Sequence, residues 1–186
     1  MFDAQCDLAA LVYEPNQDPD AILRGFAADL NGRGFRVVGM VQAGQCADSS
    51  LSAVLLHNGE NLLLAQDFDP AARGCRLDLA RLHNAGERIE EAMGHGADLV
   101  VINRFGKRER EGKGLGHLIK QALDADIPVV IAVASDRFGD WIRFAGGMSV
   151  KLPCKRDALD AWWHGVFARD ADPIIEAHPT VCEALK

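Results

Sequence analysis

The sequence predicts a three-layer α/β fold with a mostly parallel sheet and a β-hairpin insertion. Short apolar runs alternate with segments whose apolar residues recur at helical spacing, which is the pattern of a parallel sheet covered by helices. The chain begins with one such strand, helix and strand unit at residues 8–13, 19–30 and 35–41. Asn58-Gly59, a turn pair that accepts positive φ, separates two later apolar runs and indicates the hairpin.

The first helix has clear boundary signals. Asp18 suits the N-cap, because its carboxylate can accept the unpaired N–H groups of the first turn, and Pro19 needs no hydrogen bond there. Asn31-Gly32 and Gly34 end the helix. The remaining predicted elements are hairpin strands 52–57 and 61–65, helix 79–93, strand 99–102, helix 115–123, strand 127–134, helix 136–145, strand 148–152 and helix 158–167.

Three aromatic positions are predicted to contact the sheet. Trp141 and Phe144 should point inward from the helix at residues 136–145. In the last helix, Trp162 or Trp163 should cover the sheet edge or lie at an interface.

Composition limits the class of protein. With 186 residues, 48% hydrophobic and 25% charged, the chain suits one globular domain at residues 1–170 and a C-terminal tail at 171–186. The 27 acidic against 20 basic residues give a charge of −7, so nucleic acid is not an expected partner. The five cysteines form no C-x-x-C pair, and we predict neither a metal site nor a disulfide framework. The start of the chain lacks a basic leader and a membrane-length apolar run, which favours a cytoplasmic protein without membrane insertion, and a homo-oligomer stays open.

The loop after the first strand is the place where a P-loop would bind phosphate. A P-loop needs glycines, a lysine and a serine or threonine, and residues 13–20 contain none of these. Pro15 and Pro19 lack N–H donors, and the acids of the loop oppose a bound phosphate. We therefore predict that Asp18 caps the helix, and a magnesium site built from these acids is the open alternative.

Basic residues and glycines gather in two later loops, at residues 73–76 and 104–116. The second loop follows a buried strand, and ligands of parallel sheets bind beyond the carboxyl ends of strands. Glycines let the backbone approach a ligand, and the next helix would turn its N–H groups toward an anion. The predicted ligand-binding residues are Arg73, Gly74, Cys75, Arg76, Asn103, Arg104, Phe105, Gly106, Lys107, Glu109, Gly112, Lys113 and Gly114.

Less specific interpretations of the same residues stay open. Residues 107–113 can instead be a solvated loop in which Glu109 and Glu111 neutralise their neighbours. Cys75 is either a thiolate favoured by adjacent arginines, which can touch the ligand, or a buried and inert thiol. Asp78 is expected to cap the following helix.

Four stretches give a family resemblance: VVGMVQ at residues 37–42, RGCRLD at 73–78, ADLVVINRFGKREREGKGL at 97–115 and RFAGG at 143–147. In these stretches the chain resembles a bacterial domain family of unknown function, commonly encoded in molybdate-transport operons and grouped with the P-loop nucleoside triphosphatases. More distantly, the third stretch is similar to the thermophilic-type nucleoside triphosphatases. Where those enzymes carry two acids, this chain has Asn103 and Arg104, whereas Glu109 matches their later glutamate. The resemblance implies a P-loop NTPase-like fold with degenerate Walker motifs.

We therefore predict a protein that binds a small anion, an oxyanion or a phosphate-containing ligand such as molybdate or a nucleotide, without hydrolysing it. The resemblance implies an accessory role in molybdenum transport or homeostasis, with transport or cofactor-assembly proteins as partners. No catalytic residue is assigned. One alternative is an enzyme, a nucleoside triphosphatase or nucleotide transferase with a non-standard phosphate loop. Another is a regulatory interaction module that docks through exposed tryptophans. If the basic loops bind an anion, Arg104→Glu should abolish binding without unfolding the domain.

Overall fold

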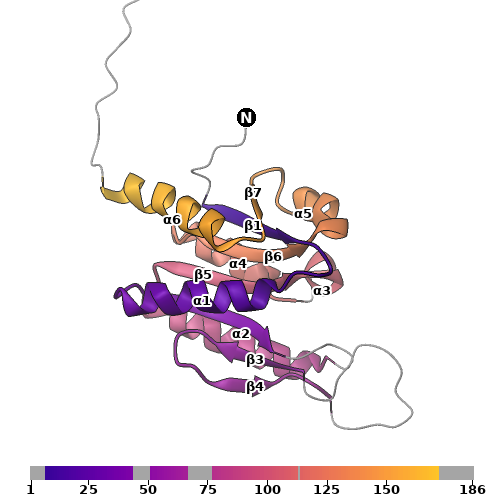
Figure 1. The fold of residues 1–186 in the computed structure, drawn as a ribbon. Helices are drawn as coiled ribbons and strands as arrows, with labels where there is room; N and C mark the ends of the chain where they lie inside the picture. The colour runs from indigo at the N-terminus through magenta and orange to yellow at the C-terminus, as the bar shows by residue number, and fades with distance from the viewer. Residues whose placement is uncertain (1–6, 44–50, 67–76, 113, 172–186) are drawn as a thin grey trace, which may run out of the picture.

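The computed structural model describes residues 7–43, 51–66, 77–112 and 114–171. Strands and helices alternate along this part of the chain (Figure 1). The elements are β1 (Leu8–Tyr13), α1 (Pro19–Gly32), β2 (Val37–Ala43), β3 (Ser52–Leu55), β4 (Asn61–Leu63), α2 (Leu79–Gly94), β5 (Leu99–Phe105), α3 (Lys107–Arg110), α4 (Gly116–Asp124), β6 (Val129–Ala134), a 3-10 turn η1 (Ser135–Arg137), α5 (Phe138–Phe144), β7 (Val150–Pro153) and α6 (Arg156–Ala171).

The described strands form one sheet in the order β4-β3-β2-β5-β6-β1-β7. The pairs from β2 to β7 are all parallel, whereas β3 pairs antiparallel with β2 and with β4. Gly59, with φ 75°, lies in the turn between β3 and β4. The predicted parallel sheet and hairpin are both confirmed, and the hairpin extends the sheet at one edge.

Helices cover both faces of the sheet, as Figure 1 shows, with α1 in front and α2 and α4 behind. Along β1, Ala9 and Leu11 belong to the core shared with α1 and α6, whereas Ala10 and Val12 belong to the core shared with α2, α4 and α5. This alternation is the period of a strand buried on both faces, and it confirms the three-layer fold. None of the helices in the described part of the chain has the length and apolar character of a membrane span.

The tryptophans of α6 are interior residues. Trp162 and Trp163 are each 3% exposed and belong to the core on the α1 side of the sheet. The Trp163 ring meets that of Phe35 edge to face, with centroids 5.3 Å apart. The predicted exposure of tryptophans for docking is therefore wrong, because the tryptophan face of α6 packs on its own sheet, whereas the prediction that Trp162 or Trp163 covers the sheet is confirmed. A regulatory interaction role stays a prediction. Trp141 is fully buried as predicted, whereas Phe144 is 39% exposed.

The segment after residue 102 differs from the prediction. The strand continues to Phe105, and residues 107–110 form the short helix α3, so the predicted strand end and an entirely solvated loop are both wrong. The Gly106 N–H donates a hydrogen bond to the Glu109 carboxylate at 2.9 Å, which closes the turn. A single helical turn stabilised by one buried carboxylate leaves no periodic apolar pattern, and the alternating charges concealed it.

Gly39 explains part of the VVGMVQ stretch. It has φ 128°, and a Cβ at this position would lie 1.9 Å from the carbonyl oxygen of Val101 on the neighbouring strand β5. Only glycine permits both this backbone angle and this approach.

Candidate ligand-binding site

A cavity of about 1130 Å³ lies at the carboxyl ends of β1, β2, β5 and β6. This is the edge of a parallel sheet at which α/β proteins bind ligands. The polar and charged side chains around it are Tyr13, Glu14, Gln42, Arg104, Lys107, Arg108, Glu109, Ser135, Asp136 and Arg137. The apolar side chains around it include Met40, Leu51, Leu64, Leu77, Leu82, Phe105 and Leu115.

A bulge at the end of β5 changes the direction of the Arg104 side chain. Ile102 pairs with Ile131 and Phe105 with Val133, so three steps along β5 match two along β6. Arg104 takes a left-handed backbone angle, φ 40°, within this irregularity. Bulges of this kind redirect a side chain next to functional sites.

The Arg104 guanidinium pairs with Asp20 in the first turn of α1. Nη2 lies 2.5 Å from Asp20 Oδ2, and the guanidinium carbon is 5.4 Å from the centre of the Tyr13 ring. The Asp20 side chain is 9% exposed and that of Arg104 34%. Burial acts to lower the pKa of Arg104, but the hydrogen bond and charge of Asp20 outweigh it and raise that pKa. The charge of Arg104 is thus largely matched inside the protein.

The loop between β1 and α1 satisfies its own polar groups. Asp18 Oδ1 accepts hydrogen bonds from the backbone N–H groups of Asp20 at 3.1 Å and Ala21 at 3.0 Å, which confirms the predicted cap. The Glu14 N–H donates to Gln17 Oε1 at 2.8 Å, and the Ser135 hydroxyl donates to the Glu14 carboxylate at 2.7 Å. The start of α1 therefore already holds a carboxylate where a P-loop helix would hold phosphate.

Glu109 is a buried carboxylate between α3 and the start of α4. It accepts the N–H of Gly106 and, at 3.4 Å, that of Leu115. Burial raises the pKa of Glu109, although these N–H groups and the charge of Arg108 act in the opposite direction. A Cβ on Gly114 would lie 2.1 Å from Glu109 Oε1, so glycine is required beside it. Glu109 therefore joins two backbone segments at the cavity wall.

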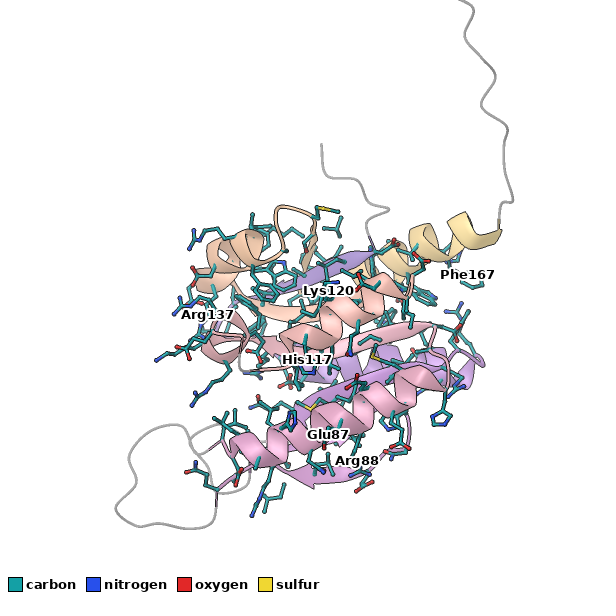
Figure 2. All side chains as sticks on the ribbon, turned by 180° about the vertical axis from the view of Figure 1, so that it is seen from behind. Glu87, Arg88, His117, Lys120, Arg137 and Phe167 are labelled. Atoms are coloured by element: carbon teal, nitrogen blue, oxygen red, sulfur yellow. The ribbon has the colours of Figure 1, made fainter. Side chains whose placement is uncertain are left out.

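Neither Arg108 nor Arg137 forms an ion pair within 4.0 Å with a carboxylate of the described residues, although the charge of Arg108 acts on Glu109, whereas Lys107 Nζ lies 3.7 Å from Glu111 Oε1. Arg137 Nη1 lies 3.7 Å from the position of a Cβ on Gly106, which places the guanidinium beside the backbone that enters α3. Figure 2 shows Arg137 at the end of the sheet where α3 and α5 lie. These two arginines are the cations of the cavity with charge left to offer a ligand.

A smaller hollow of about 240 Å³ adjoins the cavity at Arg137. Its wall also includes Lys107, Arg110 and Asp140. Burial acts to raise the pKa of Asp140, but hydrogen bonds and charges from Arg110 and Arg143 outweigh it and lower that pKa. Arg110 is therefore committed to Asp140, at 2.9 Å, and Arg137 is not.

The structure brings five of the predicted site residues to the cavity wall: Arg104, Phe105, Gly106, Lys107 and Glu109. Gly112, with φ 69°, lies in the turn after α3, Gly114 lies against Glu109, and Asn103 belongs to β5. Five other predicted residues lie outside the described residues: Arg73, Gly74, Cys75, Arg76 and Lys113.

Sequence reasoning treated Arg108 as surrounding charge and missed Arg137 and the apolar wall. One signal was available for Arg137, because residues 135–137 follow a predicted strand at its carboxyl end. The alternative of a magnesium site in the loop after the first strand receives no support from the described ranges. No group of three or more His, Cys, Asp or Glu side chains there is arranged to hold a metal ion.

The fold is that of the P-loop nucleoside triphosphatases. The chain is similar to THEP1 from the hyperthermophile Aquifex aeolicus, with a TM-score of 0.61 and 13% identity, covering 87% of this chain and 97% of that one. It is also similar to a human cancer-related nucleoside triphosphatase, with a TM-score of 0.53 and 15% identity, covering 90% of this chain and 99% of that one. Residues 8–162 match the family described as "Protein of unknown function (DUF2478)", and the chain belongs to this family.

One curated relative is similar over most of the chain. The chain is 36% identical, over 166 residues, to a protein of Bradyrhizobium diazoefficiens named "Molybdenum import ATP-binding protein ModC 2". The matched region covers 87% of this chain and only 18% of the length of that relative.

Proposed function

We propose that the protein binds an anionic ligand, a phosphate-containing molecule or another oxyanion, in the cavity at the carboxyl ends of the strands and does not hydrolyse it. The observation that carries this proposal is the pair Arg108 and Arg137, which face the cavity without forming an ion pair to a carboxylate of the described residues. An unpaired guanidinium in a partly enclosed site favours an anion, since it offers two parallel N–H donors to phosphate or carboxylate oxygens.

The charge balance of the cavity supports an anion. Four cations line it, Arg104, Lys107, Arg108 and Arg137, in a chain whose net charge is −7. Three carboxylates line it as well: Glu109 accepts backbone N–H groups, Glu14 accepts the Ser135 hydroxyl, and Asp136 is exposed. A local excess of usable positive charge on an acidic protein attracts small anions to one place.

The loop after β1 supports binding without hydrolysis. P-loop catalysis relies on backbone N–H groups, a lysine and a magnesium-bound hydroxyl around the transferred phosphate. Here Asp18 accepts two of the first N–H groups of α1, and Arg104 is directed to Asp20. Carboxylates at this position repel a triphosphate, so the degenerate Walker motifs favour a binding role.

Molybdenum import is the proposed setting. The support is the 36% sequence identity, over 166 residues, to a relative named as a molybdenum import ATP-binding protein. In this setting molybdate is one candidate ligand, and transport or cofactor-assembly proteins are the candidate partners. The net charge of −7 argues against nucleic acid.

A nucleoside triphosphatase is the second candidate. Its support is the P-loop NTPase-like fold together with a cavity of about 1130 Å³, which is large enough for a nucleotide. In this case the phosphates would lie at Lys107, Arg108 and Arg137, and magnesium would have to be held by Glu14 or Asp136.

Thermal unfolding in the presence of ligands separates the two candidates, because a ligand that binds only the folded state raises Tm. The native protein is scanned against molybdate, tungstate, sulfate, inorganic phosphate, and ATP or GTP with and without magnesium. A rise with an anion that needs no magnesium, and no release of phosphate from ATP or GTP, supports binding without hydrolysis. Magnesium-dependent phosphate release supports the second candidate.

A matched pair of variants assigns the shift to the cavity. Arg108→Gln combined with Arg137→Gln removes the two unpaired cations, and Lys120→Gln removes an exposed cation on α4. We expect the double variant to weaken anion binding about 30-fold or more, on the basis of charge-assisted hydrogen bonds, and the control to leave it unchanged. Equal binding by both variants would contradict the site.

A further inference from the structure

The cavity has a second wall that an inorganic oxyanion would not use. Met40 of β2, Leu82 of α2 and Leu115 before α4 are each under 7% exposed and line the same space as the arginines. Leu51, Leu64 and Leu77 complete this apolar wall. Because most of these side chains are almost buried, the hydrophobic gain on binding would come mainly from the apolar surface of a ligand group that packs against them.

The cavity is much larger than a single oxyanion. Its volume of about 1130 Å³ is slightly above the range of roughly 300–1,000 Å³ for sites that enclose drug-sized organic ligands. The adjoining hollow of about 240 Å³ at Lys107, Arg110 and Arg137 is closer to the scale of one small anion. Arg137 lines both the cavity and the adjoining hollow. It therefore lies where the anionic group of a ligand would meet the rest of the molecule.

The strand order separates the two walls by a definite distance. The apolar wall is centred on β2, the cationic residues follow β5 and β6, and the sheet runs in the order β2-β5-β6. Neighbouring strands are about 4.8 Å apart, so β2 and β6 are separated by roughly 10 Å. Arg108 follows β5, one strand from β2, and Arg137 follows β6, two strands from it, so the spacing fits a body of one or two aromatic rings with a phosphate at one end.

We infer that the ligand is amphiphilic, an organic phosphate or a similar oxyanion ester whose apolar ring system packs on the apolar wall while its anionic group binds Arg108 and Arg137. This inference rests on the proposed anion site and adds the chemical class of the ligand. Phe105 lines the cavity at the end of β5, where the residue is 3% exposed and its ring packs against Trp141 and Phe144, so that it supports the wall from within.

A series of probes with one head group and a growing body tests the inference. The dissociation constants of inorganic phosphate, phenyl phosphate, 1-naphthyl phosphate and uncharged 1-naphthol are measured by calorimetry on the whole chain. From the apolar surface buried, we expect 1-naphthyl phosphate to bind about 30-fold tighter than inorganic phosphate, and 1-naphthol to bind weakly.

Variants in the apolar wall provide the second measurement. Leu77 lines the cavity and is partly exposed. Leu77→Ser should weaken the binding of 1-naphthyl phosphate about 5-fold and leave the binding of inorganic phosphate unchanged. Leu63→Ser is the control, because Leu63 is an apolar side chain of β4, 52% exposed, that does not line the cavity. Far-UV circular dichroism checks that both variants fold. Nuclear Overhauser contacts from the naphthyl ring to leucine methyl groups give a readout that needs no variant.

The outcomes distinguish the inference from the proposal beneath it. Equal affinity for inorganic and naphthyl phosphate, with Arg137→Gln weakening both, would keep the anion site and overturn the amphiphilic ligand. Tight binding of 1-naphthol that Arg137→Gln does not change would overturn both. Failure of every phosphate, and of molybdate and sulfate, to bind would likewise overturn both.

Discussion

Two regions at the same edge of the sheet differ in whether their charged groups are paired within the protein. After β1, the carboxylate of Asp18 binds the first N–H groups of α1, and Asp20 binds Arg104. After β5 and β6, Arg108 and Arg137 line the cavity without forming an ion pair to a carboxylate of the described residues. The first region is already occupied by the protein's own anions, and the second has cations to offer.

This difference teaches that one ligand edge of a fold can have its charges paired from within after one strand and cations without an ion pair after another. In a P-loop protein the phosphate lies at the helix after the first strand. Here that helix start is neutralised from within, and in the order β1-β6-β5 Arg137 lies one strand away, after β6, and Arg108 two strands away, after β5. The fold predicts the edge, and only the side chains decide the position on it.

Reversing the charge of Arg104 should give the largest effect on stability. Arg104→Glu places a carboxylate against the nearly buried Asp20, and we expect a loss of about 3 kcal/mol in the free energy of unfolding. This replaces the expectation that the same substitution abolishes binding without unfolding. Urea unfolding measures the loss, and Arg24→Glu, on the exposed face of α1, is the control. Adding Asp20→Asn should restore much of the stability; no recovery would contradict the pairing.

A side chain at Gly114 should displace Glu109, which forms part of the cavity wall. In Gly114→Ala the new Cβ would meet Glu109 Oε1 at 2.1 Å, and overpacking against a buried carboxylate should cost about 2 kcal/mol. Gly139→Ala is the matched control in α5, because no atom lies within 4 Å of the Cβ it would carry. Thermal unfolding compares the two, and equal melting temperatures would show that Glu109 does not need this glycine.

Removing the cap of α1 should weaken the fold without moving the site. Asp18→Ala leaves the N–H groups of Asp20 and Ala21 without their acceptor, at a cost of about 1 kcal/mol. Asp78→Ala removes the corresponding cap of α2 and should cost a similar amount. Inorganic phosphate should bind both variants and the native protein equally well. Tighter binding to Asp18→Ala alone would mean that α1 retains a phosphate site.

The pH dependence of stability should report the burial of Glu109. Its pKa is raised in the folded state, so the favourable contribution of the protonated form is complete below the ordinary value of 4.5 and is lost as the pH rises through the folded pKa. The free energy of unfolding of the native protein, relative to Glu109→Gln, should therefore decrease over that interval. Urea unfolding at a series of pH values measures the difference. A difference that increases with pH would mean that the N–H groups of Gly106 and Leu115 outweigh burial.

Local signals in the sequence predicted most of the fold. Asp18 and Asp78 mark the starts of two helices, Asn58-Gly59 marks the hairpin, and the apolar runs mark the parallel strands. Each of these signals acts through neighbours in the chain, so a single sequence carries it. The order of strands and helices also placed five of the predicted site residues at the cavity, although β5 continues three residues beyond its predicted end.

The sequence alone did not predict which residues contact the site residues. Arg104 meets Asp20 across 84 positions, and the contact exists only because β1 and β5 both flank β6. Glu109 was treated as a charge in a loop, whereas burial and two N–H groups give it a place in the wall. The apolar wall collects side chains from distant segments, and no short pattern shows that they share one cavity.

Backbone amide shifts test most directly which of the two regions holds the anion. Two-dimensional NMR spectra of the native protein are recorded during titration with inorganic phosphate and, separately, with ATP and magnesium. We expect the largest changes at Gly106, Lys107 and Arg108 and at Ser135 to Arg137, with Asp20 and Ala21 almost unchanged. Changes centred on Asp20 and Ala21 instead would contradict the proposed anion site after β5 and β6 and place the anion at the helix after the first strand.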